Sequence, residues 1–300
     1  MSATSTRAAR LRTGPSPWIA APALAFFGVF ALVPLVGVFV LSFMRWDGLG
    51  TPAFAGLDNW KAMLGNDVTQ HGIVLTLAMT LLCWLIQTPV SLLLGVFMAG
   101  RQTYRNVLSV LYFLPLLFSA TAVGIAFNAL LDPNFGMSRA LGLDVLSQDF
   151  LGNPTLAFYT VMFVIAWCFV PFHSLLYQGA TRQIPVSVNE AAMIDGANRW
   201  QTFWYITLPQ LRNTIVTSST LMIVGSLTYF DLIFVMTAGG PGNATRVLAL
   251  DMYLTGFRSY NMGGAAVLGV MLVVVGLTIS YLLNRLSGST KMESTMEGAN

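Results

Sequence analysis

The chain has 300 residues, of which 55% are hydrophobic and only 9% are charged. A soluble globular domain carries about 25% charged residues, and a mean hydropathy of +0.69 leaves too little polar surface to solvate a fold of this size in water. The net charge of +3 is small, and the basic residues are spread along the chain. We therefore exclude a nucleic-acid partner and expect membrane lipid to surround this protein.

The first 17 residues are polar and basic and form an N-terminal tail. The apolar run that follows is too long for a signal-peptide core, so we expect it to be retained as a membrane span. A helix needs about 20 mostly apolar residues to cross a bilayer, and helices satisfy their own backbone groups in lipid. Segments of this kind lie at residues 18–43, 72–98, 107–131, 156–177, 215–237 and 264–283. They predict an all-α integral membrane protein with six transmembrane helices in one domain, residues 18–285.

The basic residues of the loops predict the orientation, because Lys and Arg gather on the cytoplasmic side. If the N-terminal tail is cytoplasmic, ten of the 15 basic residues lie inside. These are Arg7, Arg10, Arg12, Arg101, Arg105, Arg182, Arg199, Arg212, Arg285 and Lys291. Both termini, including a C-terminal tail of residues 286–300, are therefore predicted to be cytoplasmic, in a multi-pass protein of the cell membrane.

No motif for catalysis or for a cofactor occurs in the sequence. Cys83 and Cys168 lie in apolar segments and are interpreted as free thiols, and the two histidines are isolated, so no metal site is predicted. A phosphate-binding GxxxxGK[ST] loop is absent, since neither Lys61 nor Lys291 follows a glycine. We predict that the chain is not an enzyme, has no cofactor and takes its energy from a partner.

The predicted cytoplasmic loop at residues 181–213 is long and patterned. Ser187 and Glu190 have the spacing of a capping box, which predicts a short helix over residues 188–194. Gly196 permits a sharp turn. Trp200, Phe203, Trp204, Thr207 and Leu211 then recur at helical spacing, with Pro209 near the end. The pattern predicts a compact pair of helices on the cytoplasmic face.

Two interpretations of this loop remain open. It can lie on the lipid headgroups, as the aromatic residues Trp200 to Tyr205 suggest. Alternatively, its first half docks a protein, because the carboxylates of Glu190 and Asp195 would face anionic headgroups unfavourably. Small side chains at Ala191, Ala192 and Ala197 would let such a partner approach closely.

Glu190-Ala191-Ala192, Asp195-Gly196-Ala197 and Leu208-Pro209 resemble the EAA loop of binding-protein-dependent ABC importer permeases. The resemblance extends to segments 54–60, 113–115, 132–136, 230–233 and 237–242, and it covers nearly the whole chain. These segments are similar to the carbohydrate-uptake permeases, such as those for maltose and glycerol phosphate.

The resemblance implies a type I ABC importer (MetI-like) permease fold and transport of a mono- or oligosaccharide by alternating access. In that family the loop docks an ATP-binding subunit, so Glu190, Ala191, Ala192, Asp195, Gly196, Ala197, Leu208 and Pro209 become the expected coupling residues. The implied partners are an ABC ATPase dimer, a second homologous permease and an extracytoplasmic solute-binding protein.

The substrate path is less defined by the sequence. Asp231 is the only Asp, Glu, Lys or Arg within the predicted spans. It can contact sugar hydroxyls, or it can pair with a helix terminus or a partner residue. Tyr229, Asn128 and Trp167 are further candidates, each with packing as the alternative. Import of glycerol phosphate or another polyol, a secondary transporter or channel, and a membrane scaffold without transport remain alternative functions.

Overall fold

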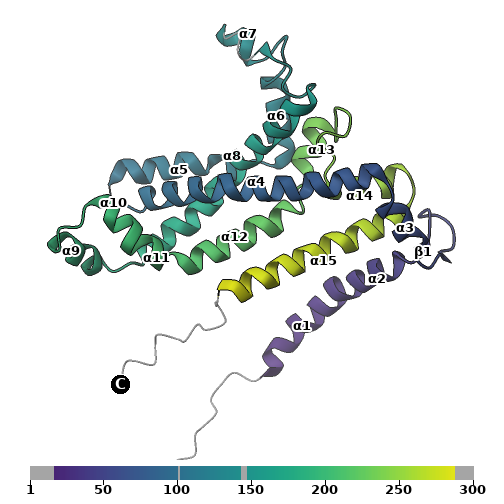
Figure 1. Cartoon of the computed structure of the whole chain (residues 1–300), viewed down its shortest axis with the longest axis horizontal. Helices are drawn as coiled ribbons and strands as arrows, with labels where there is room; N and C mark the ends of the chain where they lie inside the picture. Colours follow the sequence, from purple (N-terminus) through teal and green to yellow (C-terminus); the bar gives the residue numbers. More distant parts are fainter. Residues whose placement is uncertain (1–16, 101, 143–146, 288–300) are drawn as a thin grey trace, which may run out of the picture.

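The computed structural model describes residues 17–100, 102–142 and 147–287, which form an elongated bundle of helices (Figure 1). The N-terminal helix comprises η1 Pro17–Ala20, α1 Ala21–Phe27, the π-helical η2 Gly28–Leu32 and α2 Val33–Leu41. The following elements are α3 Asp58–Leu64, α4 Asp67–Met98, α5 Thr103–Leu117, α6 Ala120–Leu130, α7 Met137–Leu141, α8 Pro154–Arg182, α9 Val186–Ile194, α10 Arg199–Thr202, η4 Phe203–Thr207 and α11 Leu208–Gln210. The chain continues through α12 Arg212–Ser226, α13 Asp231–Thr237, α14 Leu248–Tyr253, η5 Leu254–Arg258 and α15 Met262–Ser287.

Two of the six predicted spans are not continuous helices. Four helices are long and apolar enough to cross a membrane, and the count reaches six if each of two bent pairs forms one span. The bend between α5 and α6 is 96°, and that between α12 and α13 is 45°. The predicted spans at residues 107–131 and 215–237 are therefore each helical on either side of a break.

The first break has a local cause. Pro115 has no amide hydrogen for the carbonyl one turn earlier, which weakens the end of α5. Phe118 and Ser119 then adopt extended backbone angles, and the Ser119 hydroxyl accepts a hydrogen bond from the Ala122 amide at 3.2 Å. A serine N-cap of this kind starts a new helix, so α6 leaves in a new direction and projects with α7 from the side of the bundle (Figure 1).

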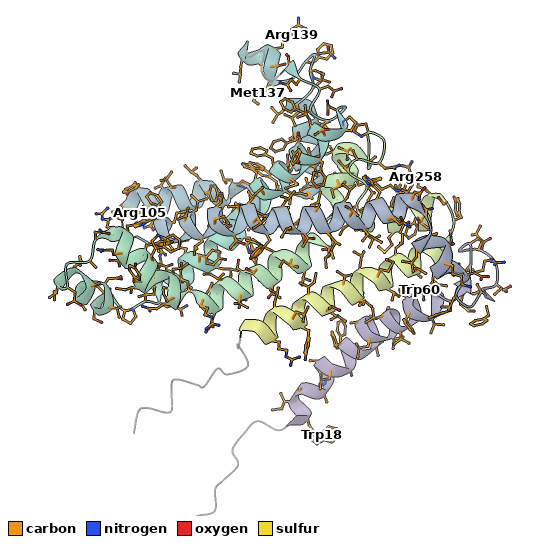
Figure 2. All side chains as sticks on the ribbon, in the orientation of Figure 1. Trp18, Trp60, Arg105, Met137, Arg139 and Arg258 are labelled. Carbon is orange, nitrogen blue, oxygen red and sulfur yellow. The ribbon has the colours of Figure 1, made fainter. Side chains whose placement is uncertain are left out.

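The N-terminal helix diverges from the rest of the chain. It meets the bundle where α2 packs against α15. No residue from 18 to 41 is buried. Figure 2 shows Trp18 at the free end of this helix, whereas Trp60 lies at the opposite, packed end. There the Trp60 indole donates to the Ser42 hydroxyl at 3.3 Å. The apolar surface between these points requires lipid or another chain to cover it.

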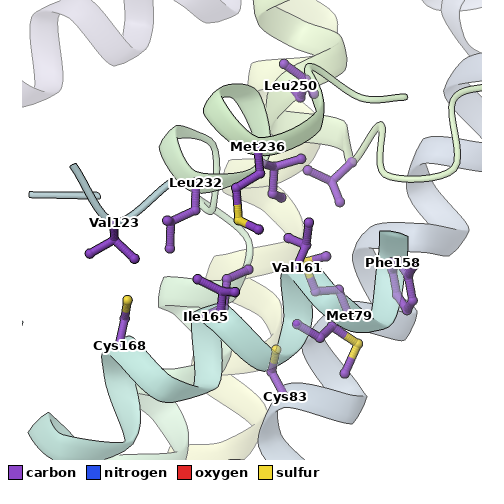
Figure 3. Packing of buried hydrophobic residues seen from close by; sticks show 14 residues of the cluster. Met79, Cys83, Val123, Phe158, Val161, Ile165, Cys168, Leu232, Met236 and Leu250 are labelled. Atoms are coloured by element: carbon purple, nitrogen blue, oxygen red, sulfur yellow. The ribbon is translucent and has the colours of Figure 1, made fainter. Parts of the chain in front are cut away.

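The centre of the bundle is the contact between α4 and α8, the most extensive helix pair. A Cβ atom added to Gly95 would lie 2.6 Å from the Ser174 carbonyl oxygen, so only glycine permits this close approach. Figure 3 shows the adjoining core, in which Val161 and Ile165 of α8 face Leu232 and Met236 of α13. Cys83 and Cys168 are buried free thiols, as the sequence predicted.

The end of the bundle beside α3 contains a two-stranded ribbon that an all-α prediction does not include. Strands β1 Met44–Arg45 and β2 Ala53–Phe54 pair antiparallel. The Asn59 amide nitrogen donates to the carbonyl oxygens of Ser42 at 3.0 Å and Met44 at 2.8 Å. This amide therefore fixes the exit of the N-terminal helix against α3.

A buried ionic cluster holds the loop before α14 against the start of α4. The Arg246 guanidinium donates to the Asp251 carboxylate from Nε at 3.0 Å and from Nη2 at 2.7 Å. The Thr69 hydroxyl of α4 donates to the second carboxylate oxygen at 2.9 Å. Asp251 is 1% exposed, so its charge is compensated inside the protein by these partners.

Candidate coupling loop and transport cavity

The loop between α8 and α12 folds into two short helices, as the sequence predicted, but the first begins two residues earlier. Helix α9 starts at Val186, with Pro185 in the N-cap position and no side-chain cap. The predicted capping box of Ser187 and Glu190 is wrong, because Ser187 already lies inside the helix. Pro185 has the extended ψ of 136° that suits a residue preceding a helix. The Glu190 side chain is consequently free of a capping role and is exposed.

The turn after α9 depends on Gly196. Its φ is +80°, the left-handed region that glycine adopts without strain. The Ala197 amide donates back to the Ala192 carbonyl oxygen at 2.9 Å, which closes the end of the helix. A capping box then starts α10: the Gln201 amide donates to the Asn198 side chain at 2.9 Å, and the Asn198 amide donates to the Gln201 side chain at 2.8 Å.

The second half of the loop packs onto the bundle. Phe203, Leu208 and Leu211 contact a buried cluster with Leu92 of α4 and Tyr177 of α8. Pro209 is exposed. The loop therefore has a firm base on the ends of α4 and α8, and α12 continues from that base.

Helix α9 itself lies at the tip of the molecule beyond the end of the bundle (Figure 1). Glu190, Ala191 and Asp195 are exposed, whereas Ala192 is buried. Met193 is 65% exposed and Ile194 is 86% exposed. These two residues were not predicted as part of the docking surface, although apolar residues beside the small alanines signal a surface for a partner.

Tyr229 and Asp231 lie together at the break between α12 and α13. They line a cavity of about 240 Å³ with Ala120, Phe169, Thr228 and neighbouring residues. The Tyr229 ring stacks on Phe169, with ring centroids 5.2 Å apart. Asp231 is exposed in the first turn of α13, where a helix N-terminus stabilises negative charge. Both interpretations of Asp231, a ligand contact and a helix-terminus charge, are compatible with this position.

Asn128 and Trp167 do not line this cavity but support its walls. The Asn128 amide nitrogen of α6 donates to the Val235 carbonyl oxygen of α13 at 2.9 Å. The Trp167 ring of α8 meets Phe127 edge-on, with centroids 5.4 Å apart. These contacts join α6 to α13 and α8, so the helices that follow the two breaks meet beside the cavity.

The histidine and acidic residues make no candidate metal centre within the described parts of the chain. His173 is buried in α8, and its Nδ1 lies 2.9 Å from the Ser218 hydroxyl of α12. This pair joins two helices of the bundle, which agrees with the structural role expected for an isolated histidine.

Comparison with known proteins identifies the family. A family profile described as "Binding-protein-dependent transport system inner membrane component" matches residues 91–290. The arabinooligosaccharides transport system permease protein AraP of Bacillus subtilis is 31% identical over 278 residues, covering 91% of this chain and 88% of that protein. The diacetylchitobiose uptake system permease protein NgcF of Streptomyces coelicolor is 30% identical over 296 residues, covering 90% and 82%.

The fold has a counterpart among solved structures. One chain of a bacterial alginate ABC transporter, crystallised in complex with an alginate pentasaccharide-bound periplasmic protein, superposes with a TM-score of 0.79. The two chains are 23% identical, and the match covers 92% of this chain and 94% of the other. This likeness supports the fold alone.

The helical bundle with its projecting loop defines a multi-pass membrane permease. The chain belongs to the binding-protein-dependent transport system inner membrane components, which are the permease subunits of ABC transporters. The predicted family, importer-permease fold and cell-membrane location are thereby confirmed. The cytoplasmic location of both termini stays a prediction.

Proposed function

We propose that this chain is one of two homologous permease subunits of an ATP-driven importer for an oligosaccharide. Relatives that align along most of its length are named for arabinooligosaccharides, diacetylchitobiose and trehalose/maltose. A solute-binding protein delivers the sugar at the outer face, and ATP is hydrolysed by a separate dimer. The chain itself supplies half of the pore and carries no ATPase activity.

The projecting helix α9 is the observation that carries the proposed coupling. It presents an acidic group at Glu190 and exposed apolar side chains at Met193 and Ile194. A partner with an apolar groove and a basic rim would cover both kinds of group. Ala191, Ala192, Asp195, Gly196 and Ala197 shape this surface, and Leu208 and Pro209 belong to its base.

Helix α12 provides a mechanical connection between the coupling loop and the cavity. It starts at Arg212, directly after the loop, and ends at Ser226, before the break at Tyr229 and Asp231. Its 15 residues span about 22 Å at 1.5 Å per residue. A displacement of the loop by the ATPase therefore reaches the cavity through one rigid element, which supports alternating access.

The cavity at the α12–α13 break favours a neutral sugar over glycerol phosphate. Its walls offer the aromatic rings of Phe169 and Tyr229, and its polar groups include the Asp231 carboxylate. Aromatic faces suit the apolar faces of sugar rings, and a carboxylate accepts hydrogen bonds from hydroxyls. The same carboxylate would repel a phosphate group.

Replacing Asp231 by Asn is expected to raise the KM for uptake about tenfold, because a charged hydrogen-bond acceptor is lost. The measurement is binding-protein-dependent uptake in vesicles containing the assembled transporter. Asp67→Asn is the matched control, since Asp67 is also an exposed acid in the first turn of a helix. If Asp231→Asn lowers the melting temperature and leaves the KM unchanged, the helix-terminus interpretation replaces the substrate contact.

The rival functions make different predictions. A secondary transporter needs ionisable groups for ion coupling, and Asp231 is the only Asp, Glu, Lys or Arg in the predicted spans. A scaffold without transport gives no reason for a cavity beside two broken helices. Co-purification of this chain with an ATPase and a second permease separates the importer from both alternatives.

A further inference from the structure

The coupling loop carries a second exposed surface, distinct from α9, on the helical segment that leads into α12. Trp200 is 66% exposed, Trp204 is 46% exposed and Tyr205 is 79% exposed. Arg199 and Arg212, both exposed, lie at the two ends of this segment. We call these five residues the aromatic-basic face.

The segment that carries the aromatic-basic face is also packed on the bundle, whereas its Trp200, Trp204 and Tyr205 rings stay exposed. Phe203 and Leu211 contact the cluster with Leu92 and Tyr177 at the ends of α4 and α8. The Trp200 ring stacks on Phe203 with centroids 6.1 Å apart, and it meets Trp204 edge-on at 5.7 Å. The outer rings are therefore held in place by a buried base.

This segment stays helical at Pro209 because the preceding turn widens into a π-helix. Proline has no amide hydrogen for the Tyr205 carbonyl oxygen, and its ring would clash with that oxygen in a regular α-helix. The chain forms the π-helical η4 at this point, in which the Leu208 amide donates to the Phe203 carbonyl oxygen. The segment thus runs through α11 almost directly into α12. Its position at the entrance of a membrane-spanning helix places it at the boundary between lipid and water.

After Arg182, the charges of the loop divide between its two halves. From Gln183 to Asn198 the charged residues are Glu190 and Asp195, both acidic. From Arg199 to Phe230 they are Arg199 and Arg212, both basic. Tryptophan and tyrosine concentrate at membrane interfaces, and arginines near the surface are attracted to anionic headgroups. The charge pattern suits a protein partner for α9 and a lipid surface for the aromatic-basic face.

We propose that the aromatic-basic face is a membrane-surface anchor: Trp200, Trp204 and Tyr205 insert at headgroup depth, while Arg199 and Arg212 bind anionic phospholipid headgroups. The anchor holds the base of the loop at the bilayer surface. When α9 is displaced, the movement passes into α12 instead of lifting the whole loop from the membrane. The lipid contact itself does not depend on the identity of the transported solute.

Tryptophan quenching by brominated lipids tests this anchor. The other five of the seven tryptophans are replaced by Phe, and the full chain is assembled with its partners in vesicles containing phosphatidylglycerol. Bromine placed near the headgroups is expected to quench Trp200 and Trp204 roughly twofold more than bromine placed near the chain ends. Quenching by aqueous iodide and by neither brominated lipid overturns the proposal, because the rings would then lie in water or against a protein.

A second probe covers the case in which the five substitutions prevent assembly. Tyr205→Cys labelled with a bimane fluorophore leaves all tryptophans in place, and the native Cys83 and Cys168 are buried. Headgroup spin labels are expected to quench this fluorophore. The double variant Arg199→Gln, Arg212→Gln is expected to lose the dependence of that quenching on phosphatidylglycerol. Quenching that is absent, or that stays equally dependent on phosphatidylglycerol in the double variant, contradicts the anchor.

Discussion

Replacing Glu190 by Lys is expected to lower ATP-driven uptake by on the order of tenfold to a thousandfold. Removing a charged group from a protein–protein interface has an effect of this size. The side chain is exposed on α9 and is not needed as a helix cap. The new charge would oppose the basic rim that we propose for the ATPase subunit. Uptake is measured in vesicles, together with the amount of ATPase that co-purifies with the permease.

The control for this prediction is Gln183→Lys. Gln183 is exposed at the end of α8, within the same loop, and the variant also adds a lysine. We expect it to retain uptake, because it lies outside the projecting helix. Equal losses in both variants would point to a general effect of positive charge on the loop, and normal uptake by Glu190→Lys would remove Glu190 from the coupling surface.

Gly196 gives an independent check of the same surface. A Cβ atom at Gly196 meets no atom within 4 Å, so a substitution acts through the backbone and not through a clash. Its φ of +80° costs a residue with a side chain about 1–2 kcal/mol, and more if it is β-branched. We expect Gly196→Val to misplace α9 and reduce uptake, and Gly196→Asn to retain most of it, because asparagine tolerates this conformation.

Replacing Asp251 by Leu is expected to lower the free energy of unfolding strongly. The change leaves the Arg246 guanidinium without its two hydrogen bonds to the carboxylate and leaves Thr69 without an acceptor. Breaking a buried ion pair costs about 3–5 kcal/mol. The Arg246 side chain is still 23% exposed, so solvent screening places the expected loss near the lower end, about 3 kcal/mol. Thermal unfolding of the purified permease complex measures it.

The double variant Arg246→Met, Asp251→Leu separates the ion pair from simple packing. It removes both charges together, so we expect it to be more stable than Asp251→Leu alone. Arg258→Leu, at an exposed arginine of the same outer region, should have little effect. If the double variant is as unstable as Asp251→Leu, the loss arises from altered packing around α14.

The membrane-spanning segments could be predicted from the sequence because twenty apolar residues in a row have few alternatives to a helix in lipid. The breaks could not, because proline alone does not decide them. Pro89 and Pro171 lie inside the continuous helices α4 and α8, whereas Pro115 precedes a break. The cavity at Tyr229 and Asp231 likewise exists because two breaks meet in space.

The coupling loop shows where local signals are ambiguous. Ser187 with Glu190 and Asn198 with Gln201 both have the spacing of a capping box, and only the second pair forms one. Pro185 decides the first case by starting the helix ahead of Ser187. The contact of Asp251 with Thr69 had no sequence signal, since the two residues are 182 positions apart.

ATP-dependent uptake in reconstituted vesicles tests the proposed role of this chain most directly. Vesicles contain the chain, a second permease and the ATPase, and the sugar is supplied on its solute-binding protein. We predict uptake that requires ATP and all of these components, with no uptake by this chain alone. Equal uptake by this chain without ATP and without the ATPase would contradict the account, because the chain would then be a self-sufficient channel or secondary transporter.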